Sequence, residues 1–249
     1  MIRNPLADPY LLGLSGGSGL GAVIAISLGG GGRLSVPLAA FAGAMLAIAL
    51  VYRLSLVEGR RMDVRVLLLA GVVVGAFAVA VMSAVIALSD SSQLRNAFLW
   101  LLGGFGGASW QGLGTFALYA TIPLALLFAN ARALDLLALG EDSAQHLGVE
   151  LERTKRVVYL STGLLTAVGV ATCGIIGFVG LVVPHAVRRL WGPLHRTLLP
   201  ITFLVGGAFL VLADALARTV VRPLELPVGV VTALVGVPLF ALLLRRTLA

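Results

Sequence analysis

Charged residues are scarce in this sequence. Of its 249 residues, 12% are charged and 59% are hydrophobic. A soluble domain of this length carries about 25% charged residues, so water is not the main solvent of the chain. Apolar runs of about 17–25 residues, the length that crosses a bilayer core as a helix, recur from one end to the other. The composition therefore predicts a membrane protein with several spans.

Cysteine and lysine are each present once. The single cysteine, Cys173, excludes an internal disulfide. A phosphate-binding loop of the Walker A type needs glycine, lysine and then serine or threonine. The only lysine, Lys155, follows Thr154, so the chain has no recognisable ATP-hydrolysing loop of its own.

Glycine is abundant near the start of the chain. The segment Gly17–Ala22 has the spacing G-x-G-x-x-A of a dinucleotide-binding loop. That loop needs a strand before it and an acidic residue about 20 positions later. Here prolines precede it, and the next acidic residue is Glu58. Because Gly17 and Gly21 are four residues apart in an apolar run, they favour close packing of membrane helices instead.

Residues for metal or proton chemistry are also few. The histidines are His146, His185 and His195, and none has a second ligand at metal-binding spacing. Asp214 is the clear acidic residue inside an apolar run, and Arg218 lies on the same face one turn later. The two residues form either an ion pair near a helix end or part of a proton or cation site. We expect no cofactor and no metal.

Eight candidate spans follow from the apolar runs, and the sixth is short and interrupted by Gly180 and Pro184. Such a segment is typical of a kinked or partial crossing. The spans cover residues 10–28, 37–53, 65–88, 112–129, 157–173, 176–190, 200–220 and 228–244. An even number of crossings places both termini on one side of the membrane.

The basic residues predict which side that is. Cytoplasmic connections carry an excess of lysine and arginine. With both termini inside, fourteen of the eighteen basic residues are cytoplasmic and four are outside. The inside set is Arg3, Arg53, Arg60, Arg61, Arg65, Arg132, Arg153, Lys155, Arg156, Arg188, Arg189, Arg196, Arg245 and Arg246. The outside set is Arg33, Arg95, Arg218 and Arg222. This distribution explains the net charge of +7 without nucleic acid.

Two connections are too long to be simple turns. Residues 89–111 lie outside in this topology, and we expect a short helix around Leu94–Leu102. Residues 130–156 lie inside, are rich in helix-forming residues and predict one or two short helices on the cytoplasmic face. Within them, Asp142–Gly148 reads as an acidic residue, two small residues, three variable residues and glycine. Such a turn suits close contact with another protein, although a plain amphipathic surface helix gives the same pattern.

Together these segments resemble the FecCD family, the permease subunits of ABC importers for iron-siderophores, haem and vitamin B12. The matching pieces are "RNPLADPYLLGLSGGSGLGA", "LLLAGVVVG", "WLLGGFGGASW", "LGEDSAQHLGV", "CGIIGFVGLVVPHAVRRLWG", "LADALAR" and "ELPVGVVTALVGVPLFALLLRR". They occur in the family's order and cover nearly the whole chain.

The resemblance implies an all-α, polytopic membrane bundle of the ten-helix type II ABC importer permease fold. Two helices precede the "RNPLADP" loop in that fold, and this chain begins at the loop. The eight spans would therefore be the third to tenth. All of residues 1–249 would form a single permease domain in a bacterial plasma or inner membrane, with both termini cytoplasmic.

The resemblance also implies roles for residues. Segment 140–148 looks like a variant of the loop that couples the permease to the ATPase; its residues are Gly140, Glu141, Asp142, Ser143, Ala144 and Gly148. Asn4, Pro5 and Leu6 would form the cytoplasmic gate, or else an ordinary turn before a helix. Arg218 would dock the substrate-binding protein, or else pair wholly with Asp214.

These implications define the expected function. The chain is expected to be a transport subunit rather than an enzyme, forming a homodimer around a path for an iron chelate or corrinoid. Its expected partners are two ABC ATPase subunits, a substrate-binding protein and membrane lipid, with no nucleic acid. The alternative is a secondary transporter or channel that works alone, which would use intramembrane charges and broken-helix ion sites.

Overall fold

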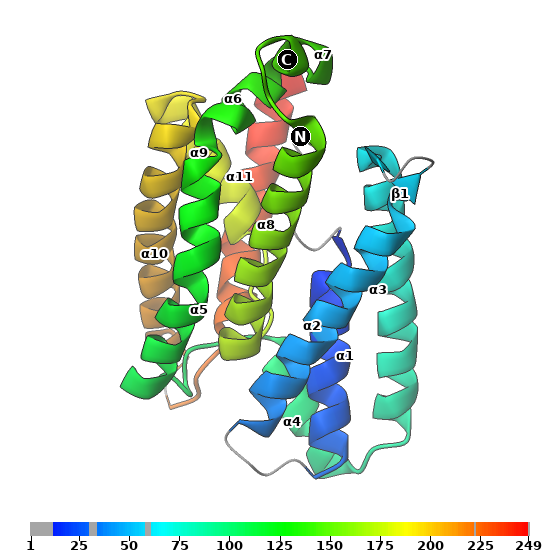
Figure 1. The fold of residues 1–249 in the computed structure, drawn as a ribbon. Coiled ribbons are helices and arrows are strands. Elements are labelled where there is room, and N and C mark those ends of the chain that lie inside the picture. Colours follow the sequence, from blue (N-terminus) through cyan, green and yellow to red (C-terminus); the bar gives the residue numbers. More distant parts are fainter. Residues whose placement is uncertain (1–11, 30–33, 58–60, 222, 249) are drawn as a thin grey trace.

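The computed structural model describes residues 12–29, 34–57, 61–221 and 223–248 (Figure 1). These residues form helices and one short pair of strands. In chain order the elements are α1 (Leu14–Ser27), α2 (Ser35–Leu54), β1 (Leu56–Val57), β2 (Arg61–Met62), α3 (Val64–Ala87), α4 (Ser91–Leu101), α5 (Trp110–Ala129), α6 (Ala131–Leu139), α7 (Glu141–His146), α8 (Leu151–Cys173), α9 (Val179–Trp191), α10 (His195–Thr219) and α11 (Val228–Leu248). The predicted all-α membrane bundle is confirmed.

The helices fall where the apolar runs predict them. Among the described residues, α2, α3, α5, α8 and α10 are long and apolar enough to cross a membrane. The helix α1 and the part Val228–Ala241 of α11 are apolar but shorter. Every predicted span thus contains a helix, because a run of this length can satisfy its backbone in lipid only as a helix or in a closed barrel.

The sixth span is a partial crossing, as predicted, but the break lies elsewhere. The helix α9 has 13 residues, about 20 Å at 1.5 Å per residue, whereas the hydrocarbon core is about 30 Å thick. Gly180 and Pro184 lie inside α9, and the non-helical residues are 174–178. Gly174 and Phe178 have φ of 71° and 67° there. These positive φ angles are incompatible with a continuing α-helix. The segment 174–178, and not Pro184, therefore separates α8 from α9.

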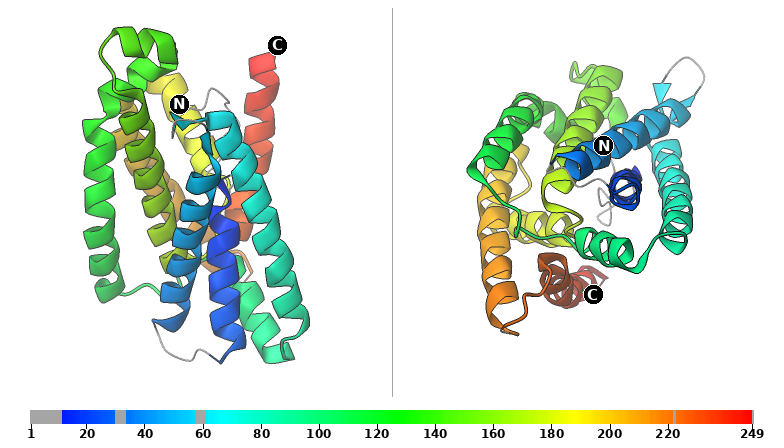
Figure 2. Two further views of the ribbon diagram at one scale, coloured as in Figure 1. Left: turned by 45° about the vertical axis from the view of Figure 1, so that its right-hand side comes forward. Right: turned by 90° about the horizontal axis from the view of Figure 1, so that it is seen from below.

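The connections gather at two ends of the bundle. The elements β1, β2, α6 and α7 lie at one end, which we call the α7 end (Figures 1 and 2). The helix α4 and the start of α5 lie at the opposite end, the α4 end. The connections predicted to be cytoplasmic thus share one end, and those predicted to be outside share the other.

The helix α1 is packed closely among its neighbours, between α2, α3 and α4 (Figure 2, right). A Cβ atom built on Gly21 would stand 2.1 Å from the carbonyl oxygen of Ala39 in α2, and one on Gly43 would stand 2.2 Å from that of Gly17. Backbones this close leave no room for a side chain. The predicted role of Gly17 and Gly21 in helix packing is therefore confirmed, and the dinucleotide loop is excluded by the helix that contains them.

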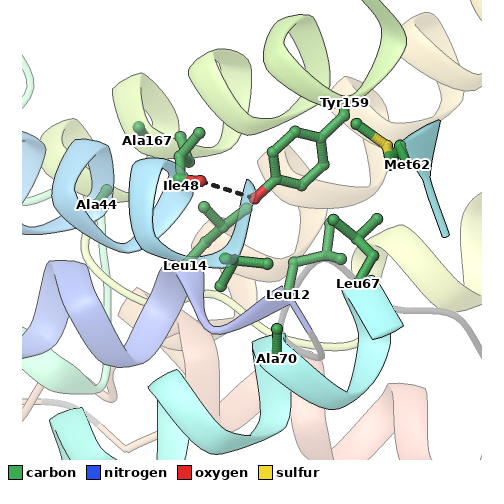
Figure 3. Packing of buried hydrophobic residues seen from close by; sticks show 10 residues of the cluster. Leu12, Leu14, Ala44, Ile48, Met62, Leu67, Ala70, Tyr159 and Ala167 are labelled. Carbon is green, nitrogen blue, oxygen red and sulfur yellow. Dashed lines mark hydrogen bonds between the residues drawn. The ribbon is translucent and has the colours of Figure 1, made fainter. Parts of the chain in front are cut away.

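A buried tyrosine joins α8 to α2 (Figure 3). The Tyr159 hydroxyl donates to the carbonyl oxygen of Ile48 at 3.1 Å, and its ring stacks on Tyr52 with centroids 6.2 Å apart. Leu14, Leu67 and other apolar side chains surround it. The hydrogen bond satisfies the one polar atom of a side chain that is 1% exposed, as burial requires.

Two small features went unpredicted. The strands β1 and β2 form an antiparallel ribbon of two residues each between α2 and α3, pairing Leu56 with Met62. Asp63 then caps α3 through its carboxylate, which accepts the N–H groups of Arg65 and Val66. These hydrogen bonds stabilise the charged carboxylate and hold the pKa of Asp63 below its usual value.

The close contact of α1 with α2 predicts the effect of a single methyl group. Gly21→Ala should lower the free energy of unfolding by about 1–3 kcal/mol, the usual cost of overpacking. Gly114→Ala in α5 is the control, because nothing lies within 4 Å of its added Cβ, and alanine gains about 1 kcal/mol of helix propensity there. Thermal unfolding followed by circular dichroism in detergent measures both. Equal midpoints for the two variants would contradict the packing.

Candidate functional sites at the two ends of the bundle

The predicted coupling segment forms two short helices, α6 and α7. Gly140 separates them with φ 128° and ψ 154°, a conformation that only glycine adopts readily. The segment 130–156 thus contains the two short helices expected for it, followed by the first turns of α8. The sharp turn at Gly140 makes α7 a separate projection at the α7 end (Figure 1).

Gly148 ends α7 in a defined motif. Its φ is 85°, its N–H donates to the carbonyl oxygen of Gln145, and the N–H of Val149 donates to that of Ala144, both at 3.0 Å. This pair of hydrogen bonds is the Schellman arrangement, in which a left-handed residue satisfies the last carbonyls of a helix. The pattern's glycine is therefore explained by backbone geometry within this chain.

The two small residues of the predicted contact turn, Ser143 and Ala144, do not both face outward. Asp142, Ser143 and Gln145 are exposed, but Ala144 is completely buried against its own chain. Ala144 is small because its own chain packs over it. The surface that α7 offers to another molecule therefore consists of the acidic and polar residues around Ala144.

An ion cluster around a buried lysine, which was not predicted from the sequence, lies behind α7. The side chain of Lys155 is 5% exposed, and its Nζ lies 2.7 Å from Oε2 of Glu141 and 3.8 Å from Oε1 of Glu152. The other oxygen of Glu152 accepts the N–H of Met62 at 2.8 Å. Glu152 and Lys155 are three residues apart on one helix face, but the contacts of Lys155 with Glu141 and Met62 join segments 14 and 93 positions apart. No local pattern reveals those two contacts.

A polar cleft opens beside this cluster. It has a volume of about 1180 Å³ and lies between the α7–α8 connection and the start of α3. Its walls carry charges of both signs, among them Asp63, Arg65, Glu141 and Lys155. A cleft of mixed charge suits polar contact with another protein better than selection of a single ion.

A second pair joins α6 to α10 at the same end. Asp135 accepts the backbone N–H of His195 at 2.9 Å, and its Oδ1 lies 2.6 Å from Nδ1 of the same histidine. The carboxylate thus caps the first turn of α10. His195 therefore has a partner on α6, and the pair joins the two helices at the α7 end.

The α4 end carries the acidic and basic pair predicted on α10. Nε of Arg218 donates to Oδ2 of Asp214 at 2.8 Å. The Arg218 side chain is 42% exposed, and this is the one hydrogen bond recorded for it among the described residues. Two terminal guanidinium nitrogens therefore remain for a partner. Both residues line a cleft of about 890 Å³ with Glu225 and residues 103–107.

The residues predicted to form the cytoplasmic gate, Asn4, Pro5 and Leu6, lie outside the described residues. Within the described part of the chain, no three histidine, cysteine, aspartate or glutamate side chains are grouped to hold a metal ion.

The geometry of these ends can be compared with known proteins. Residues 1–246 match the FecCD transport family. The chain belongs to this family. The resemblance inferred from the sequence motifs is thereby confirmed.

Individual relatives agree along nearly the whole chain. The ABC transporter permease protein YvrB of Bacillus subtilis is 42% identical, over 99% of this chain and 70% of its own. The cobalamin import system permease BtuC of Halobacterium salinarum is 43% identical, over 98% and 65%. The vitamin B12 import system permease BtuC of Escherichia coli is 41% identical, over 99% and 75%. The chain thus spans about two thirds to three quarters of these relatives.

A solved structure shares the fold. It shows an inward-facing conformation of a metal-chelate type ABC transporter, with a TM-score of 0.89 and 33% identity over 98% of this chain and 77% of that one. The chain is therefore a multi-pass membrane permease of the ABC importer type, a class of transport subunit.

The cap of α7 gives a prediction that needs no partner. Gly148→Ala should fray α7, because a left-handed conformation costs about 1–2 kcal/mol in a residue with a Cβ, and a loss of this size raises the open fraction about 5–30-fold. Nothing lies within 4 Å of the added Cβ, so the effect is conformational. Amide hydrogen exchange of residues 144–149 measures it. Gly148→Asn should exchange more slowly than Gly148→Ala, and equal rates would contradict the cap.

Proposed function

We propose that this chain is the membrane-spanning permease subunit of a binding-protein-dependent ABC importer. Its substrate would be an iron-siderophore, haem or vitamin B12-like molecule, carried along a path between two copies of the chain. The observation that carries the proposal is the match along nearly the whole chain to permeases whose names specify cobalamin or vitamin B12 import.

ATP hydrolysis would take place in a partner. The single lysine is buried in an ion cluster at the α7 end, and no Walker A loop accompanies it. Asp142, Ser143 and Gln145 on the exposed face of α7 would contact an ABC ATPase subunit, one for each copy of the permease. The polar cleft behind α7 supports a contact of this kind.

The membrane orientation follows from charge. The predicted cytoplasmic connections, which carry most of the arginines, gather at the α7 end. By the positive-inside rule that end faces the cytoplasm of a bacterial cell, and both termini would be on the cytoplasmic side. Asn4, Pro5 and Leu6 would then close the cytoplasmic mouth of the path.

A secondary transporter or channel is the second candidate, and one observation favours it. The interrupted segment between α8 and α9 resembles the discontinuous helices of secondary transporters. Such proteins also use intramembrane charges, and here Asp214 is paired with Arg218. The two candidates differ in whether transport requires ATP.

The deciding experiment measures transport in inverted membrane vesicles, in which the cytoplasmic face is on the outside. Vesicles that contain the tagged complex from its native membrane, loaded with the substrate-binding protein and a radiolabelled corrinoid or ferric siderophore, should release the label only when ATP is added outside. Transport driven by an ion gradient without nucleotide would establish the second candidate instead.

A substitution on α7 tests the ATPase contact. Ser143→Arg should lower ATP-driven transport at least about tenfold, the factor for 1.4 kcal/mol of lost contact energy, because a bulky cation does not fit a close-packed interface. Ala138→Arg on exposed α6 is the control. We choose Ser143 over Ala144, since arginine at the buried alanine would disrupt the chain itself. Unchanged transport with Ser143→Arg would remove α7 from the contact.

A charge reversal tests docking of the substrate-binding protein at the α4 end. Arg218→Glu should slow association of that protein about tenfold at low salt, as expected when electrostatic steering is reversed. A matching acidic-to-basic change on the binding protein should restore the rate. Arg95→Glu, also exposed at this end, controls for general charge.

The competing role of Arg218 has a different signature. If the arginine serves only Asp214, Arg218→Glu and Asp214→Ala should both destabilise the permease and leave association unchanged. That outcome would assign the pair to structure alone.

A further inference from the structure

Lys155 occupies an unusual position for a cation. It is the one lysine of the chain, and only 4% of the residue is exposed, although it lies in the first turns of α8 at the α7 end. A lysine ammonium in such a place needs partners, because its desolvation is costly.

The partners of Lys155 belong to different elements. Glu141, the first residue of α7, receives the short contact of 2.7 Å. The carbonyl oxygen of Met62 in β2 lies 3.5 Å from Nζ. Glu152, on α8, lies beside the ammonium and accepts the N–H of Met62. The lysine thus joins α7, α8 and the β1–β2 ribbon at a single point.

The other side of this junction is rigid. Met62 is 3% exposed and packs in the core cluster with Leu67 and Tyr159 (Figure 3). Tyr159 lies one turn after Lys155 and is hydrogen-bonded to α2. In contrast, the Glu141 side chain is 47% exposed. A movement of α7 can therefore act on the β1–β2 ribbon through the Glu141–Lys155 ion pair, while the core around Met62 stays packed.

We infer that Lys155 is a positioning residue that, through Glu141 on one side and Met62 on the other, transmits displacement of α7 to the connection between α2 and α3. The inference rests on the proposed function, in which an ATPase subunit displaces α7. The movement would be transmitted by the Lys155–Glu141 ion pair, and removing this pair should leave the helix bundle folded.

The first test uses the full chain without partners. Spin labels at Ser143→Cys on α7 and Arg65→Cys at the start of α3, both exposed positions, are introduced with Cys173→Ala. Electron spin resonance measures the distance between them in detergent. We expect a narrow distribution for the parent and a broader one for Lys155→Met, because α7 then loses its ion pair with Lys155 and is held only by the packing of Ala144 and its chain connections.

Lys155→Met is chosen so that the fold survives. The methionine side chain is unbranched and close in length to lysine, so it fills the buried space. The carboxylates left without the ammonium, Glu141 and Glu152, are 47% and 39% exposed and remain hydrated, which avoids the cost of an unpaired buried charge. Glu141→Ala removes the same ion pair at its exposed carboxylate and leaves Lys155 beside Glu152. It should broaden the distance distribution as well. Lys155→Arg should give an intermediate width, since the charge is retained but the planar fork is less suited than a compact ammonium to partners that approach from three directions. Arg156→Met, exposed on the same helix, is the control for charge and should leave the distribution narrow.

The second test uses the complex isolated from its native membrane. Lys155→Met should still bring down the ATPase subunit and hydrolyse ATP, but transported corrinoid or siderophore per ATP should fall. A coupling between two sites is typically worth a factor of about 5–150, and we expect a loss within this range. Lys155→Arg should restore part of the ratio, because it retains the charge but not the compact ammonium.

The two tests separate the inference from the proposed function. Unchanged distance distributions in Lys155→Met and Glu141→Ala would overturn the inference, whatever the partner. A broadened distribution with an unchanged transport ratio would also overturn it, because the ion pair would then be structural only. Absence of any ATPase subunit from the parent complex would instead overturn the proposed function.

Discussion

The direct contact of the α1 and α2 backbones determines how the rest of the structure is held. Lipid gives helices no hydrophobic reason to associate, so they must gain energy by packing closely. Gly21 and Gly43 allow this where any side chain would collide with a carbonyl oxygen. Through α2 the contact extends to Tyr159 on α8, and one turn earlier on α8 lies Lys155. A series of contacts thus runs from the glycines of α1 and α2, through Tyr159, to the turn of α8 that pairs with α7.

Most of the helices could be predicted because their cause is local. An apolar run of sufficient length must become a helix in a bilayer, and all eight runs did. The interruption at residues 174–178 was misplaced because proline is a visible signal, whereas a left-handed Phe178 is fixed by tertiary contacts. The β1–β2 ribbon, only two residues on each strand, has too short a pattern for sequence to reveal.

The candidate sites divide in the same way. The turn glycine Gly148 was predictable, since a left-handed cap has a strong residue preference. The inward direction of Ala144 was not, because a helix of six residues has no second turn to show which face is apolar. The Lys155 cluster joins residues separated by 14 and 93 positions. Such contacts follow from the arrangement of helices in space, which the family resemblance supplies and residue patterns do not.

The choice of lysine at position 155 fits its place in the chain. Arginine, which supplies the other cations of this protein, has a planar fork suited to carboxylates approaching from one side. A compact ammonium with three donors can instead meet groups from three directions, here Glu141, Glu152 and the Met62 carbonyl. Of the two carboxylates, that of Glu141 is 47% exposed and that of Glu152 is 39% exposed, whereas Met62 is 3% exposed. The junction is therefore firm towards the core and adjustable towards α7. That asymmetry is what a permease needs if its ATPase is to move α7 while the bundle around Tyr159 stays packed.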